Sequence, residues 1–149
     1  MDVKHISFDA LKTYWAETDH FGQSGKKVRE VVRSLGPYPA TYMDPPRQSY
    51  GLFDGDQMIG ATHLVVWSDT WLRYRTINVL PDYRGQDLGW LLLTHAVNMD
   101  WQEWKQQDRY LFGWVKRDHQ QWSLSHGFRA YDDTWHDDHI IMIKPLSDF

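Results

Sequence analysis

The chain has 149 residues, a formal net charge of −4 at pH 7 and no cysteine. Its length and its 42% of hydrophobic residues suit a single globular domain over residues 1–149 rather than a disordered or fibrous protein. The acidic balance argues against a nucleic-acid partner, which needs a basic face, and the missing cysteines exclude disulfides, thiolate nucleophiles and cysteine-ligated zinc.

The first third of the chain predicts a short strand and two helices. Its start lacks the basic and apolar regions of a secretory signal, and no apolar stretch approaches the ~20 residues that span a membrane. We therefore expect a cytoplasmic protein with no membrane partner. Residues 2–7 suit a strand, and residues 7–21 suit a helix with Ser7 as its N-cap. Residues 24–36 predict a second helix that ends at Gly36.

The middle of the chain predicts a hairpin and a further strand. Asp54-Gly55 separates two β-prone runs within residues 49–67, which is a strong hairpin signal. In the strand at 70–80, apolar residues occupy even positions before Thr76 and odd positions after it. A β-bulge near Thr76 would produce this change of phase. A strand that is buried on both faces can show the same change of positions without a bulge. Both interpretations stay open.

The last third predicts a crossover and a closing hairpin. Residues 85–107 suit a helix whose wide apolar stripe packs on a sheet, and residues 109–115 suit a central strand covered on both faces. Residues 118–128 predict a short helix with Asp118 as N-cap and Gly127 as its stop. The element order indicates a mixed α/β or α+β sheet with helices on it and one central strand-helix-strand crossover.

The turn inside that crossover, in "NVLPDYRGQDLGWLLL" from Asn78 to Leu93, suits a phosphate group. A turn between a strand and a helix points backbone N–H groups at one spot, where the helix dipole adds positive charge. The positive charge of Arg84 and the small size of Gly85 would allow a pyrophosphate to bind at this turn. Two known phosphate motifs do not fit, because no Lys-Ser/Thr pair follows the glycines and no G-x-G-x-x-G is present.

These residues resemble a known family. "INVLPDYRGQDLGWLLL" resembles the acetyl-CoA-binding signature of the GCN5-related N-acetyltransferase superfamily, in which a strand ending in Val-x-Pro leads to Arg/Gln-x-x-Gly-x-Gly/Ala at a helix start. Arg84 and Gly89 match the outer positions of that signature. "WSLSHGF" resembles the superfamily's second motif, a short helix that closes on Gly127-Phe128.

The resemblance implies a fold and a site for acetyl-CoA as co-substrate. The fold would be a mixed, mostly antiparallel sheet of six to seven strands with about four helices, in which a bulge splays the fourth strand from the fifth. The backbone of Ile77, Asn78 and Val79 would bond the acetyl and pantetheine portion of acetyl-CoA. The pyrophosphate would be held by N–H groups of the turn, namely those of Arg84, Gly85, Gln86, Asp87, Leu88, Gly89 and Trp90.

Two residues depart from the family's pattern. Asp87 stands where the inner glycine is usual, and its carboxylate would repel a pyrophosphate unless it points to solvent or pairs with a cation such as Arg84. We therefore expect weakened coenzyme binding. Ser123 replaces the tyrosine that often protonates the departing thiolate, so Tyr131 or a water would have to serve instead.

The remaining proton chemistry has several candidates. Arg73 and Arg75 on the fourth strand cannot act as bases; we expect them to face solvent, with binding of an acidic acceptor as the alternative. His63 and Asp118 could each relay a proton through water. The simpler interpretations are a half-buried strand histidine and a helix cap.

The closing hairpin carries acidic residues that would attract an amine or form a solvated turn, namely Asp132, Asp133, Asp137 and Asp138. His136 and His139 would point to opposite faces of a strand, so no metal site is expected. The 15% of aromatic residues fill a core or line a ligand groove, and a homodimer is compatible with them.

Two functions fit these observations. The first is an acetyl-CoA-dependent N-acetyltransferase that acts on a primary amine of a small molecule or a protein. The second is a non-catalytic acyltransferase-like module with a binding or structural role. Asp87, Ser123 and the lack of a carboxylate on the fourth strand favour the second.

Overall fold

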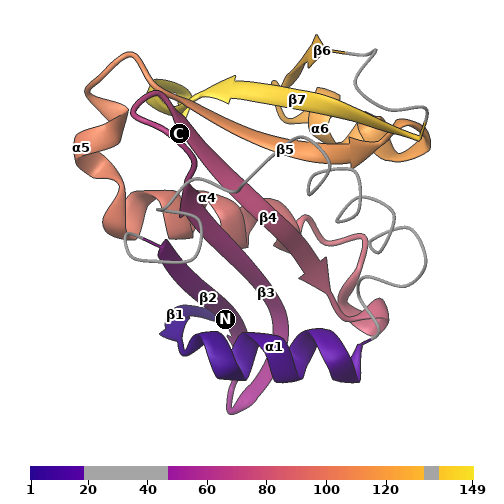
Figure 1. The fold of residues 1–149 in the computed structure, drawn as a ribbon. Helices are drawn as coiled ribbons and strands as arrows, with labels where there is room; N and C mark the ends of the chain where they lie inside the picture. The colour runs from indigo at the N-terminus through magenta and orange to yellow at the C-terminus, as the bar shows by residue number, and fades with distance from the viewer. Residues whose placement is uncertain (19–46, 133–137) are drawn as a thin grey trace.

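The computed structural model describes residues 1–18, 47–132 and 138–149. Within them the strands are β1 (Asp2–Ile6), β2 (Arg47–Asp54), β3 (Gln57–Val66), β4 (Trp71–Val79), β5 (Tyr110–Lys116), β6 (Arg129–Asp132) and β7 (His139–Pro145). They form one seven-stranded sheet in the order β1-β2-β3-β4-β5-β7-β6 (Figure 1). Only β4 and β5 pair in parallel; the other neighbours are antiparallel. The predicted mixed, mostly antiparallel sheet is confirmed.

The α-helices of the described residues are α1 (Phe8–Glu17), α4 (Leu88–Asp100), α5 (Gln102–Lys105) and α6 (Gln120–Ser125). Short 3₁₀ turns are η1 (Pro81–Tyr83), η2 (Arg117–His119) and η3 (Leu146–Asp148). The predicted cap of α1 is confirmed, because Ser7 Oγ accepts the Ala10 N–H at 3.0 Å. The helix predicted at 24–36 lies outside the described residues.

The β2–β3 hairpin and the bulge on β4 follow the sequence predictions. Gly55 turns the hairpin with φ 61°, which glycine adopts without strain. On β4, Tyr74 pairs with Leu64 and Ile77 pairs with Thr62. Two residues of β4 between these pairs therefore oppose one residue of β3, which confirms a β-bulge at Thr76.

The Thr62 side chain stabilises this bulge. Its hydroxyl donates a hydrogen bond to the Thr76 carbonyl, and both side chains are buried. A bulge disrupts the local ladder, so a buried carbonyl there needs another partner. The Thr62 hydroxyl supplies it from the neighbouring strand.

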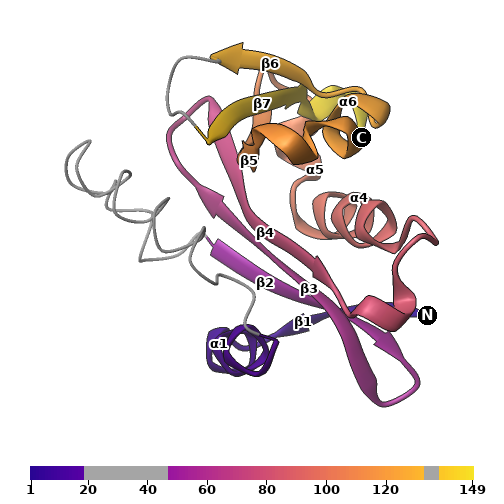
Figure 2. The same cartoon turned by 90° about the vertical axis from the view of Figure 1, so that its right-hand side faces the viewer.

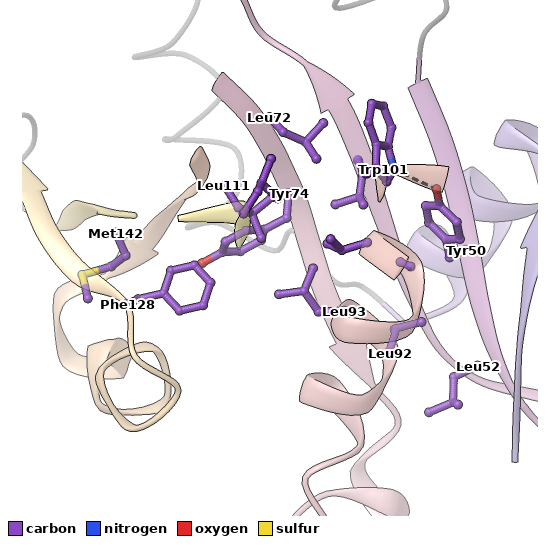
Figure 3. Close-up of a cluster of buried hydrophobic side chains, with 14 of the residues drawn as sticks. Tyr50, Leu52, Leu72, Tyr74, Leu92, Leu93, Trp101, Leu111, Phe128 and Met142 are labelled. Atoms are coloured by element: carbon purple, nitrogen blue, oxygen red, sulfur yellow. Dashed lines mark hydrogen bonds between the residues drawn. The ribbon is translucent and has the colours of Figure 1, made fainter. Parts of the chain in front are cut away.

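The helix predicted over 85–107 is shorter at its start and broken near its end. Residues before Leu88 form η1 and a turn in which Gly85 and Asp87 have positive φ, so they cannot belong to the helix. Trp101 (φ −118°, ψ 23°) separates α4 from α5. Its buried indole donates to the Tyr50 hydroxyl at 3.0 Å, shown by the dashed line in Figure 3, and this bond fixes the break.

The C-terminal elements correct one further prediction. Asp118 is not the N-cap of α6: it lies inside η2, and His119 precedes the helix without a side-chain cap bond. Gly127 (φ 83°) ends the helix as predicted. The closing β6–β7 hairpin is also confirmed, although its tip at 133–137 lies outside the described residues.

The sheet separates two layers of helices. Figure 2 shows α1 on one face and α4 and α6 on the other. The main core lies between the sheet and α4; Figure 3 shows its buried side chains, among them Leu52, Leu72, Leu92, Leu93 and Leu111. A smaller core forms under α1, and its buried members are Leu11, Tyr14, Trp15 and Ala61.

We predict that Thr62→Val lowers the free energy of unfolding by about 1–3 kcal/mol, because it keeps the side-chain shape but leaves the buried Thr76 carbonyl unpaired. In a chain of this size each kcal/mol shifts Tm by about 2–4 °C, which thermal unfolding resolves. Thr62→Ser retains the hydroxyl and is the control. Equal losses in both variants would contradict the assigned hydrogen bond.

Candidate functional site

The candidate site begins where β4 and β5 separate. Their pairing covers only Trp71–Arg73 and Tyr110–Phe112, in strands that the structure describes in full. Beyond it, β4 keeps its pairing with β3 and β5 keeps its pairing with β7. We call the two segments that no longer pair with each other, Tyr74–Val79 of β4 and Gly113–Lys116 of β5, the splay; Figure 1 shows the two strands diverging there.

The inner edge of β4 in the splay is not paired with β5. Leu80 donates its N–H to the Ile59 carbonyl, so the alternation of an antiparallel ladder turns Asn78 toward β3 and turns Ile77 and Val79 toward the splay. Of the three residues predicted to bond acetyl-CoA through their backbone, Ile77 and Val79 therefore have the suitable orientation. The Asn78 side chain points toward α1, where it donates to Thr18 Oγ1 at 3.0 Å.

The turn from η1 to α4 lies at the wide end of the splay. Gly85 has φ 80° and Asp87 has φ 60°, so two residues of the turn adopt left-handed backbone before the helix starts. The first hydrogen bond of α4 runs from the Leu91 N–H to the Asp87 carbonyl. The helix N–H groups before Leu91 therefore have no carbonyl of the helix to bond. Arg84 N–H already donates to the Pro81 carbonyl at 3.2 Å. We call residues 84–90 the cradle.

Gly89 explains why the cradle lies so close to β4. A Cβ at this position would come 3.1 Å from Ile77 Cγ2, which is closer than packed side chains normally allow. A side chain there would push the start of α4 away from the strand. The Arg84 side chain bridges the same gap, since its Nε donates to the Val79 carbonyl at 2.9 Å.

Asp87 is an aspartate in a left-handed backbone conformation. Asp and Asn visit this region more readily than most other non-glycine residues. Its carboxylate pairs with a histidine rather than with Arg84: Asp87 Oδ1 lies 2.9 Å from His126 Nε2. The sequence analysis named Arg84 as a candidate partner for this carboxylate, and the structure places His126 beside it instead.

An aromatic cluster joins the start of α4 to α6. The Trp90 ring stacks on His126 with a centroid distance of 4.4 Å and an interplanar angle of 12°. Trp122 and Phe128 contact Trp90 edge-on, and Phe149 closes the cluster. The two motifs identified in the sequence are therefore in direct contact in the fold.

Tyr74 lies at the narrow end of the splay. Its ring packs on Gly113, where a Cβ would come 2.2 Å from Tyr74 Cζ, so β5 requires glycine there. Burial raises the pKa of Tyr74 to about 12, while the nearby Ser123 hydroxyl and the Arg73 charge lower it in part. Ser123 is fully buried, and its hydroxyl lies close to that of Tyr74.

The three predicted catalytic residues do not converge. Ser123 lies beside Tyr74, whose ring packs on Phe128 (Figure 3). Tyr131 is 60% exposed on β6 and packs on Trp71, at the paired end of β4. Asp118 is exposed in η2. Sequence reasoning missed Tyr74, because in the strand pattern it is one more apolar residue.

The opposite face of the splay carries α1 and two arginines. Trp15 Nε1 donates to Thr76 Oγ1 at 3.1 Å, beside the bulge. His63 is 1% exposed under the rings of Phe8 and Trp15, so it is a core histidine rather than a half-buried one. The prediction that Arg73 faces solvent is wrong. Arg73 is 6% exposed, and its guanidinium carbon Cζ lies 3.9 Å from the centroid of the Trp114 ring.

Two kinds of feature are absent from the described residues. No group of three or more His, Asp or Glu residues among them is arranged to hold a metal ion. None of the helices in the same part of the chain combines the length and apolar composition needed to cross a membrane.

Comparisons with known proteins agree with this geometry. The model of the acetyltransferase (GNAT) family matches residues 11–121. Among curated proteins, none matches the chain. Solved structures share the fold at low sequence identity.

Three solved structures illustrate this. PaiA N-acetyltransferase from Thermoplasma acidophilum, in complex with coenzyme A, is 18% identical over 97% of this chain and 99% of its own, with a TM-score of 0.64. A GNAT-family acetyltransferase from Staphylococcus aureus Mu50 is 14% identical over 97% and 98%, with a TM-score of 0.69. One from Elizabethkingia anophelis, with acetyl-CoA bound, is 19% identical over 70% and 78%, with a TM-score of 0.54.

We predict that Gly113→Ala lowers the free energy of unfolding by about 1–3 kcal/mol, because its Cβ collides with the Tyr74 ring. In a Tyr74→Leu background the same substitution has little effect, since the ring is gone. Urea unfolding of the four proteins gives the coupling energy between the two positions. Additive effects would mean that Gly113 is not required by Tyr74.

Proposed function

We propose that this chain, which belongs to the GNAT acetyltransferase family, transfers the acetyl group of acetyl-CoA to a primary amine of a small molecule or a protein. The splay carries this proposal. It combines an unpaired strand edge, a phosphate cradle at its wide end and a buried tyrosine at its narrow end.

The cradle suits the pyrophosphate of the coenzyme. Backbone N–H groups at the start of α4 precede the helical ladder, and the helix dipole places about half a positive charge there. Gly85 and Asp87 have the positive φ that such a turn needs. The Thermoplasma and Elizabethkingia structures contain coenzyme A and acetyl-CoA, which supports the same coenzyme here.

The inner edge of β4 suits the amide-bearing arm of the coenzyme. Ile77 and Val79 turn their backbone groups toward the splay, and an extended chain with its own amides can pair with those of Ile77 and with the Val79 N–H, since the Val79 carbonyl already accepts from Arg84. Tyr74 and Val79 are about 17 Å apart along the strand. An extended ligand that is held by the cradle and lies on this edge therefore ends near Tyr74.

Tyr74 is the residue we assign to proton transfer. The thioester of acetyl-CoA supplies the activated acetyl group, and acyl transfer to an amine requires a proton for the departing thiolate. The Tyr74 hydroxyl carries its proton at neutral pH, as tyrosine ordinarily does, and burial raises its pKa further, to about 12. The amine nitrogen forms the new C–N bond as the C–S bond of the thioester breaks, and it releases a proton to water. The Tyr74 phenolate takes a proton back from water, so atoms and protons balance.

The acceptor class rests on one neighbour and on the layout of the sheet. The Thermoplasma neighbour is an N-acetyltransferase, which favours an amine acceptor. The splay is covered by α4 and α6 on one face, so the acceptor would approach from the face that carries α1 (Figure 2). The cytoplasmic location and the homodimer stay predictions from the sequence.

The rival function, a non-catalytic module, is favoured by Asp87, Ser123 and the lack of a carboxylate on the fourth strand. Two of these three features have a compensating neighbour in the structure: His126 pairs with Asp87, and Tyr74 brings a hydroxyl beside Ser123. We therefore favour the enzyme over the non-catalytic module.

Acetyl-CoA is expected to raise Tm by several degrees. A ligand at 100 times its Kd adds about 2.7 kcal/mol to the free energy of unfolding, and Tm responds by about 2–4 °C per kcal/mol in a chain of this size. Free CoA should act similarly and ATP should not. If millimolar acetyl-CoA left Tm unchanged, the proposed function would be wrong.

Tyr74→Phe is expected to lower kcat with acetyl-CoA by about 10²-fold or more, because the thiolate loses its proton donor. Its Tm shift with acetyl-CoA should stay near that of the wild type. The assay is thiol release with a panel of primary amines. Tyr131→Phe and Ser123→Ala test the two residues predicted from the sequence; a larger loss in either of them than in Tyr74→Phe would refute the assignment.

A further inference from the structure

The carboxylate of Asp87 poses a problem that the proposed function must solve. It belongs to the cradle, where a pyrophosphate would meet a like charge, and such repulsion is strong at short range. The Asp87 side chain is 62% exposed, so the backbone alone does not fix where its carboxylate points. A residue that orients this carboxylate would determine how well the cradle accepts an anion.

His126 has the geometry for that task. Its Nε2 lies 2.9 Å from Asp87 Oδ1, and its side chain is only 14% exposed. One face of the ring stacks on Trp90 at 4.4 Å, and Trp122 lies 4.8 Å from it at an angle of 60°. The imidazole is therefore held between α4 and α6.

The backbone of His126 is held as well. Its carbonyl accepts a hydrogen bond from Lys144 Nζ at 2.9 Å, and Lys144 is itself buried on β7. His126 is the C-cap of α6, directly before the left-handed Gly127. The charged groups in contact with His126 in the described part of the chain are thus Asp87, through the ring, and Lys144, through the carbonyl.

We propose that His126 is a positioning residue for coenzyme binding, whose Nε2–H holds the Asp87 carboxylate against α6 and leaves the cradle N–H groups to the pyrophosphate. This inference rests on the proposed function. A neutral ring with the proton on Nε2 and a protonated ring both donate from this atom. The role accounts for an aspartate inside the cradle, because the hydrogen-bond donor that orients its carboxylate comes from the second motif.

The experiment is a double-mutant cycle with CoA as the ligand, measured by isothermal titration calorimetry. Asp87→Asn removes the charge and keeps a residue that tolerates the left-handed region. His126→Phe removes the donor but keeps a ring to stack on Trp90. His126→Gln keeps an N–H donor without the ring, and His95→Phe, at an exposed position of α4, is the matched control.

With Asp87 present, His126→Phe should weaken CoA binding at least tenfold, which corresponds to about 1.4 kcal/mol. In the Asp87→Asn background the same substitution should change Kd less than about twofold. His126→Gln should retain part of the affinity, and His95→Phe should bind like the wild type. Each variant's Tm without ligand checks that it folds.

Two results would overturn the inference. Equal losses from His126→Phe in the wild-type and Asp87→Asn backgrounds would show that His126 acts independently of the carboxylate, and no loss in either would show that it plays no part. A wild-type protein that binds neither CoA nor acetyl-CoA is a different outcome, since it would refute the proposed function and this inference together.

Discussion

The β-bulge in β4 is the feature on which the rest of the site depends. One extra residue opposite His63 shifts the register of β4 against β3, and the Thr62 hydroxyl replaces the ladder partner of the Thr76 carbonyl. A bulge bends its strand and increases the local twist. Pairing with β5 stops two residues before this bulge, while both strands keep their outer partners. The sheet thus opens in its middle without losing the pairs on either side.

An open strand edge inside a sheet is unusual. Unpaired backbone groups cost free energy when they are buried, and they tend to pair with other chains when they are exposed. Here the two ends of the opening are filled in different ways. At the narrow end the Tyr74 ring packs against the bare backbone of Gly113. At the wide end the Arg84 side chain donates to the Val79 carbonyl. Between them, the edge of Ile77 and Val79 is the part that a ligand with its own amides would complete.

The packing of α4 against α6 connects the two motifs physically. Trp90, from the first motif, stacks on His126, which precedes the Gly127-Phe128 of the second. The same histidine lies 2.9 Å from the carboxylate of Asp87, the residue that departs most clearly from the family's pattern. A substitution that looks unfavourable in one motif is therefore balanced by a residue in the other. Such compensation cannot be recognised while each motif is considered alone.

The sequence by itself determined the features that depend on local chemistry and on periodicity. The Ser7 cap, the Gly55 turn, the bulge near Thr76 and the order of strands and helices all follow from neighbouring residues, because side-chain spacing and backbone preference act over a few positions. What only the tertiary structure decided involves partners far apart in the chain. The burial of Arg73 against Trp114, the break of α4 at Trp101 beside Tyr50, Tyr74 at the narrow end of the splay and His126 beside Asp87 all depend on which elements the fold brings together. No local pattern encodes these pairings, since each results from the packing of whole strands and helices.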